Sequence, residues 1–110
     1  MLINVLKSKI HRAKITHSHL EYAGSFGIDK DIMKKAGILP YEKILVGNVN
    51  TGERFETYCI EEPAGSHKFC LYGATARLGV PGDIVIIMLF AQMTPEEAAN
   101  HKPMVVDFSA

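Results

Sequence analysis

A glycine–serine pair, Gly24 and Ser25, is the first feature of the sequence that could do chemistry. Because glycine has no Cβ, Gly24 can hold a strained backbone that brings the next hydroxyl onto its own carbonyl carbon. A serine hydroxyl placed there can attack the preceding peptide bond and convert it to an ester. Taken alone, the pair is also typical of an ordinary loop. No G-x-S-x-G elbow surrounds Ser25, so the sequence does not support a hydrolase triad.

A second group of reactive side chains lies on a predicted strand: Arg54, Thr57 and Tyr58. The Arg54 guanidinium can pair with a carboxylate, and Tyr58 carries a phenolic proton that it can donate. Strand alternation places Arg54 and Tyr58 on one face and Thr57 on the other. All three can share a site only near a strand end, a bulge or a subunit boundary. An exposed strand with no site favours the same residue types.

Two further segments have both a functional and an ordinary interpretation. Lys9 and His11 lie on one face of a predicted strand, either as the wall of an anion pocket or as solvated charges. The small residues Gly73, Ala74 and Thr75 would let backbone N–H groups approach a ligand closely. A plain tight turn has the same composition.

A metal-binding β-barrel is an alternative enzyme hypothesis. His11, His17, His19 and Glu21 have matching strand parity and could align as ligands. The later histidine that a two-motif metal barrel of this kind needs is absent after Pro81–Gly82, so we expect no metal. A non-catalytic binding or assembly module is a second alternative, and it requires nothing of Ser25.

The elements that must position these residues are mostly short strands. An Asp29 cap and a terminal Gly37 predict one short helix, and a Thr94 cap followed by Pro95 predicts another to about Asn100. A glycine- and serine-containing break is expected over residues 23–27, and a bend over 73–76. The absence of a βαβ rhythm predicts a mainly β barrel or sandwich with six or seven strands. The predicted strands are Leu2–Leu6, Lys9–His17, Glu42–Val49, Glu53–Ile60, His67–Tyr72, Asp83–Phe90 and Met104–Phe108.

Composition narrows the class of protein. The chain has 110 residues, 47% of them hydrophobic, and a formal net charge of zero, which predicts one domain over residues 1–110 and no nucleic-acid partner. Its longest apolar run, Ile84–Ala91, is far short of the roughly 20 residues that span a bilayer. Early charged residues argue against a secretory signal. Cys59 and Cys70 lack metal or disulfide spacing, so we expect reduced core thiols in a cytoplasmic protein.

Several short motifs, in this order and spacing, resemble the pyruvoyl-dependent aspartate 1-decarboxylase family over about residues 1–108. The family's fold implies a small double-psi β-barrel with two short helices, assembled as a homotetramer. Three positions depart from the family's pattern: Ala23 stands in place of Glu, Tyr72 in place of Asn, and Thr75 in place of Ala. The motifs are Lys9-Ile10-His11-Arg12, Glu21-Tyr22-Ala23-Gly24-Ser25, Gly27-Ile28-Asp29, Arg54-Phe55, Thr57-Tyr58, Gly73-Ala74 and Gly82-Asp83-Ile84-Val85-Ile86-Ile87.

The resemblance implies a proenzyme that cleaves itself between Gly24 and Ser25. Ser25 Oγ would attack the Gly24 carbonyl, with Thr57 assisting, and the ester would eliminate to dehydroalanine. Hydrolysis would release ammonia and leave a pyruvoyl group at residue 25, without metal or pyridoxal phosphate. The products would be a β chain of residues 1–24 and an α chain of residues 25–110.

The resemblance also implies decarboxylation of L-aspartate to β-alanine and CO2, which supplies pantothenate and coenzyme A synthesis. The substrate amine would form a Schiff base with the pyruvoyl ketone at residue 25, and Tyr58 would donate the proton that replaces CO2. The residues expected to bind substrate are Lys9, Arg54, Thr57, Gly73, Ala74 and Thr75.

Overall fold

The computed structural model describes residues 1–109, and its strands form one eight-stranded sheet with the order β2-β6-β3-β5-β4-β7-β1-β8. The predicted mainly β fold is confirmed, with eight strands rather than six or seven, and it is consistent with a small β-barrel. The strands are β1 (Ile3–Lys14), β2 (His17–His19), β3 (Ser25–Asp29), β4 (Lys43–Asn48), β5 (Arg54–Glu62), β6 (Phe69–Tyr72), β7 (Ile84–Met93) and β8 (Met104–Asp107).

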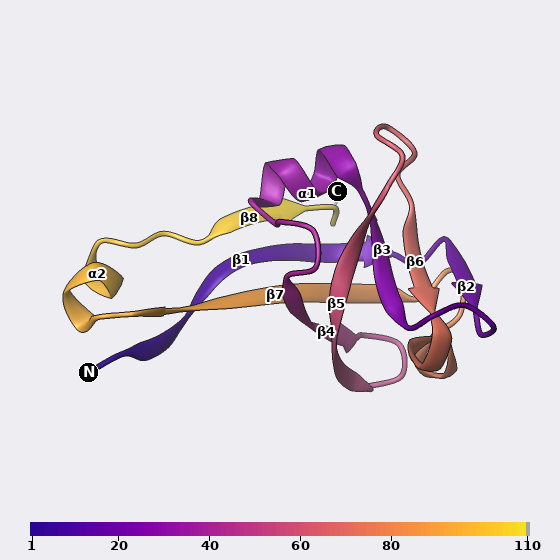
Figure 1. Cartoon of the computed structure of the whole chain (residues 1–110), viewed down its shortest axis with the longest axis horizontal. Coiled ribbons are helices and arrows are strands. Elements are labelled where there is room, and N and C mark those ends of the chain that lie inside the picture. The colour runs from indigo at the N-terminus through magenta and orange to yellow at the C-terminus, as the bar shows by residue number, and fades with distance from the viewer. Residues whose placement is uncertain (110) are drawn as a thin grey trace.

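A long antiparallel pair of strands, β1 and β7, forms the axis of the molecule, which measures 43 × 26 × 25 Å (Figure 1). β2, β3, β5 and β6 gather around one end of this pair, β8 lies along the middle of β1, and the N-terminus and the short helix α2 (Pro95–Ala99) lie at the other end. The prediction of two separate strands in residues 2–17 was wrong. One strand covers most of this range because register shifts after Leu6 and Ile10 absorb the irregular pattern without ending the pairing with β7.

Two strands, β2 and β3, were not predicted from the sequence. β2 ends shortly before the glycine–serine pair, and β3 begins at its serine. The segment predicted as a break, residues 23–27, contains the start of β3, all of whose residues are buried. β3 pairs in parallel with β5 and in antiparallel with β6, and β2 pairs in parallel with β6. The strand predicted to begin at His67 starts at Phe69, because His67 has a left-handed φ of 57°.

Both predicted helices are present with the caps that predicted them. In α1 (Lys30–Ala36) the Asp29 carboxylate accepts the Asp31 N–H, and Gly37 ends the helix with a φ of 68°. Thr94 forms a capping box with Glu97 at the start of α2. The bend predicted over residues 73–76 is instead a 3₁₀ helix, η1 (Gly73–Leu78). Within residues 1–109, every helix falls short of the length and apolarity needed to cross a membrane.

The core lies between the sheet and α1, with Ile10, Phe26, Ile28, Val46 and Ile87 fully buried. Packing of these side chains supplies the main stabilisation of such a fold. Phe26 and Ile28 belong to β3, so the strand that begins at Ser25 is anchored in the core on the C-terminal side of the glycine–serine pair.

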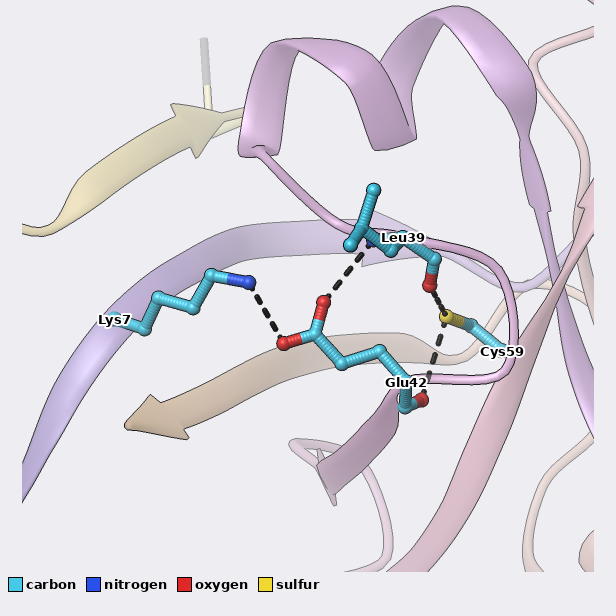
Figure 2. A network of polar contacts seen from close by, with 4 residues as sticks. All are labelled: Lys7, Leu39, Glu42 and Cys59. Atoms are coloured by element: carbon cyan, nitrogen blue, oxygen red, sulfur yellow. Dashed lines mark hydrogen bonds and ion pairs between the residues drawn. The ribbon is translucent and has the colours of Figure 1, made fainter. Parts of the chain in front are cut away.

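A polar network fastens the loop between α1 and β4 to the sheet (Figure 2). The Lys7 ammonium lies 2.7 Å from the Glu42 carboxylate, which also accepts the Leu39 N–H at 3.0 Å. The Cys59 thiol donates to the carbonyl oxygens of Leu39 and Glu42 at 3.3 and 3.4 Å. Burial raises the pKa of the Cys59 thiol to about 11, so it stays protonated at neutral pH. Cys59 and Cys70 are both free and buried, as predicted.

Candidate active site

Ser25 is the first residue of β3 and lies between two neighbouring strands. It pairs with Tyr72 of β6, and its side chain is only 3% exposed. On the other side, β3 runs parallel to β5 with Phe26 opposite Cys59. Because the strands run in the same direction, Ser25 lies beside Tyr58, the residue before Cys59. The fold therefore brings the predicted nucleophile, at the start of β3, beside the predicted proton donor, in the middle of β5.

The backbone before Ser25 is held against the start of η1. Gly73 has a φ of 67°, which side chains rarely tolerate. A Cβ on Gly73 would lie 2.7 Å from Gly24 Cα and 2.8 Å from the Tyr22 carbonyl oxygen. Only glycine therefore allows η1 to approach the Gly24–Ser25 peptide this closely.

Thr75 places a hydroxyl on the C-terminal side of the same peptide. Its Oγ1 lies 3.3 Å from the Ser25 carbonyl oxygen and 2.9 Å from the Tyr72 carbonyl oxygen, and the residue is 8% exposed. The hydroxyl donates into the backbone around Ser25 and does not face solvent. Ala74, which lies between Gly73 and Thr75 in η1, is exposed.

Tyr58 and Thr57 follow the predicted alternation along β5. Tyr58 is 40% exposed and its ring centroid lies 6.3 Å from that of Tyr41. Thr57 is half-buried and pairs with Ile44 of β4. Tyr58, in the middle of β5 beside Ser25, is therefore open to a ligand, whereas Thr57 points toward the opposite side of the strand.

The two predicted cations, Lys9 and Arg54, line one cavity of about 210 Å³ together with Asn48, Ile86 and Met88. The described residues that line this cavity include neither Ser25 nor Tyr58. Arg54 stands at the start of β5, four residues before Tyr58, which is about 13 Å along an extended strand. Within one chain the cation cavity and the surroundings of Ser25 are thus separate.

Comparison with known proteins now identifies the family. The family model described as aspartate decarboxylase matches residues 1–110. A protein of Clostridium acetobutylicum named aspartate 1-decarboxylase is 54% identical over 106 residues, which cover 96% of this chain and 84% of the relative. A protein of the same name from Lactiplantibacillus plantarum is 56% identical over 106 residues, covering 96% of this chain and 82% of the relative.

The chain belongs to the aspartate decarboxylase family. The predicted resemblance and the prediction of an enzyme of this family are confirmed.

Tyr72, which lies beside Ser25, was not predicted to be a functional residue. The Tyr72 hydroxyl donates to Glu62 Oε2 at 2.7 Å, and burial and this acceptor raise the pKa of the phenol far above its ordinary value. The rings of His19 and Tyr22 lie 5.7 and 5.3 Å from the Tyr72 ring. These contacts join β2, the loop before Gly24 and β6. They arise from strand pairing, which no local pattern in the sequence predicts.

The alternative metal ligands do not form a centre in the part of the chain that the structure describes. Across residues 1–109, no group of three His, Cys, Asp or Glu side chains is arranged to hold a metal ion. His17 and His19 instead stack on each other with ring centroids 5.9 Å apart. The donor set of this family member therefore gives no support to the metal-barrel alternative.

Proposed function

We propose that the chain decarboxylates L-aspartate to β-alanine and CO2 with a pyruvoyl group that it makes from Ser25. Membership of the aspartate decarboxylase family supports the reaction. The single observation that carries the proposal is the position of Ser25, buried at the start of β3 between Tyr72 and the strand that carries Tyr58. By the same inference from the family, the product supplies pantothenate and coenzyme A synthesis in the cytoplasm.

Self-cleavage begins with attack of Ser25 Oγ on the Gly24 carbonyl carbon, and the peptide bond becomes an ester. The close packing of Gly73 on Gly24 supports this step, because it restricts the backbone on the N-terminal side while the core holds β3 on the other. Thr57 assists the cleavage. Elimination then separates residues 1–24 from residues 25–110, and hydrolysis with loss of ammonia leaves the ketone.

The residues around Ser25 fit a pyruvoyl group, since the position is buried and the Thr75 hydroxyl reaches its carbonyl oxygen. Such a group supplies a ketone that withdraws electrons from the substrate carbon bearing the carboxylate to be lost. Tyr58, exposed in the middle of β5 beside Ser25, donates the proton that takes the place of CO2. The backbone of Gly73 and Ala74 at the start of η1, with Thr75, contacts the substrate.

Lys9 and Arg54 attract and orient the substrate carboxylate. The net charge of the chain is zero, so an anionic substrate with two carboxylates gains no long-range attraction from the protein as a whole. Two cations in one cavity supply that attraction locally. Thr57 completes the substrate-binding set.

We propose that the working unit is a homotetramer in which different copies complete each site. The separation of the Lys9–Arg54 cavity from Ser25 within one chain supports this. So do large apolar side chains that one chain leaves exposed on β1, β7 and β8. These are Ile3, Phe90, Met104 and Val105.

Co-expression of two inactive chains tests the shared site. Ser25→Ala and Arg54→Ala chains are each expected to be inactive alone, whereas mixed tetramers regain β-alanine formation if the two residues act from different copies. Inactive mixtures, with mixed tetramers verified by native mass spectrometry, would contradict the shared site.

Denaturing mass spectrometry tests the proposed function itself. The purified chain is expected to yield two fragments, residues 1–24 and residues 25–110, the larger carrying a carbonyl that borohydride reduces. Ser25→Ala is expected to remain intact and inactive, whereas the matched control Ser66→Ala cleaves and turns over like the wild type. An intact wild-type chain that binds a ligand without turnover would favour the non-catalytic module instead.

A further inference from the structure

The Thr75 hydroxyl lies between two backbone carbonyls and has one proton to share between them. Its Oγ1 is 2.9 Å from the Tyr72 carbonyl oxygen and 3.3 Å from the Ser25 carbonyl oxygen. A hydroxyl donates one hydrogen bond at a time, and rotation about the Cβ–Oγ bond selects the acceptor. The proton therefore turns toward whichever carbonyl oxygen carries more negative charge.

The Ser25 carbonyl oxygen gains negative charge at one defined stage of the proposed self-cleavage. In the ester, the Ser25 Cα–H bond breaks, its proton goes to water, and the electron pair spreads from Cα onto the adjacent carbonyl oxygen. The pair then forms the Cα–Cβ double bond, the Cβ–Oγ bond breaks, and Gly24 leaves as a carboxylate. This elimination requires no oxidant, reductant or metal.

We infer that Thr75 promotes the elimination step of self-cleavage by donating its hydroxyl proton to the Ser25 carbonyl oxygen. The inference rests on the proposed function and deepens it. Thr75 is buried, so a hydrogen bond to developing charge is stronger there than in water. The packing of Gly73 on Gly24 holds η1 beside β3, so the hydroxyl is already in place.

The inference assigns Thr75 to one step and not to the other. During the earlier attack of Ser25 Oγ, negative charge develops on the Gly24 carbonyl oxygen, whereas both acceptors of the Thr75 hydroxyl are the carbonyls of Ser25 and Tyr72. Loss of the hydroxyl should therefore slow elimination and leave ester formation largely intact. A residue with a purely structural role would slow both steps together.

The test follows two species after refolding of the uncut chain, in wild type, Thr75→Val and Thr75→Ser. The ester has the mass of the uncut chain, but neutral hydroxylamine cleaves it into residues 1–24, as the hydroxamate, and residues 25–110 beginning with Ser. In a portion of the sample kept free of hydroxylamine, the completed product instead appears as residues 25–110 lighter by one ammonia than the chain that begins with Ser. Denaturing mass spectrometry therefore separates uncut chain, ester and pyruvoyl chain without any activity assay.

Thr75→Val is expected to accumulate hydroxylamine-sensitive ester and to form the pyruvoyl chain roughly three- to tenfold more slowly, the effect of one hydrogen bond. Thr75→Ser, which keeps the hydroxyl, is expected to restore elimination. Pyruvoyl formation by Thr75→Val at the wild-type rate, or equal slowing of ester formation, would overturn the inference. If Thr75→Val fails to fold, as judged by circular dichroism, Thr75→Ala takes its place with the same expected outcomes. If the wild type forms neither ester nor pyruvoyl, the proposed function itself fails.

Discussion

Gly73 packs directly on Gly24, with so little space between them that a Cβ on Gly73 would lie 2.7 Å from Gly24 Cα. The contact joins the start of η1 to the peptide that we propose is cut. Gly73 also has a left-handed φ of 67°, so a side chain there would meet both backbone strain and a steric clash.

Gly73→Ala is expected to destabilise the chain and to slow its self-cleavage. The matched control is Gly52→Ala, because Gly52 has a similar φ of 81° but nothing within 4 Å of its Cβ position. We expect Gly52→Ala to cost about 1 kcal/mol and Gly73→Ala about 2–4 kcal/mol, since overpacking is added to the backbone strain. Urea unfolding in a Ser25→Ala background compares the variants as uncut chains. Equal costs for the two would show that the Gly73–Gly24 contact can relax.

The Lys7–Glu42 ion pair is expected to contribute more stability than the Lys43–Glu56 pair. The Lys7 and Glu42 side chains are 30% and 25% exposed, against 75% and 56% for Lys43 and Glu56, so water screens the first pair less. Double-mutant cycles with Lys→Met and Glu→Gln substitutions are expected to give a coupling of about 1 kcal/mol for Lys7–Glu42 and below about 0.5 kcal/mol for the exposed pair. Glutamine at position 42 can still accept the Leu39 N–H, so the cycle isolates the charge pair. Equal couplings would contradict the expectation.

Local signals in the sequence were sufficient to predict the helices and most of the sheet. Asp29 and Gly37 carry cap chemistry that acts within one turn of α1, and Thr94 acts in the same way on α2. β3 was missed because Gly24, Ser25 and Gly27 have the composition of a turn. Its strand conformation comes from pairing with β5 and β6, which are distant in the sequence.

The site could be predicted only in part for the same reason. Strand alternation predicted correctly that Arg54 and Tyr58 share the exposed side of β5. That Lys9 and Arg54 line one cavity depends on β4 and β7 lying between their strands, which no local pattern encodes. The contact of Thr75 with the Ser25 carbonyl depends on the antiparallel register of Ser25 with Tyr72.

The Asp29 carboxylate is expected to make the chain less stable in acid. Burial alone would raise the pKa of this carboxyl, but N–H groups of His67, Asp31 and Gly65 donate to it and bring the pKa below its ordinary value of 3.8. A lowered folded-state pKa adds stability above pH 3.8, which is lost as the pH falls through the folded-state pKa.

Asp29→Asn is therefore expected to cost about 1–2 kcal/mol near neutral pH, and the difference from the wild type should shrink below pH 3.8. Chemical unfolding over a pH series in the Ser25→Ala background measures the difference. The control Asp31→Asn removes an exposed carboxylate from the same helical turn and is expected to cost less than about 0.5 kcal/mol. If the difference in unfolding free energy between the wild type and Asp29→Asn stays constant below pH 3.8, the charge of the Asp29 carboxylate does not cause it.

Tyr58→Phe is expected to separate self-cleavage from turnover. The substitution removes only the hydroxyl of a side chain that is 40% exposed, so the packing around Ser25 should persist and the chain should still yield residues 1–24 and 25–110. Loss of the proton donor should lower β-alanine formation per cleaved chain by about 100-fold or more. Tyr41→Phe is the matched control, because its ring lies 6.3 Å from the Tyr58 ring. We expect it to change turnover by less than about twofold, since its hydroxyl donates no proton in the reaction. If Tyr58→Phe instead blocks cleavage as severely as turnover, Tyr58 acts in forming the pyruvoyl group and another residue delivers the proton to the product.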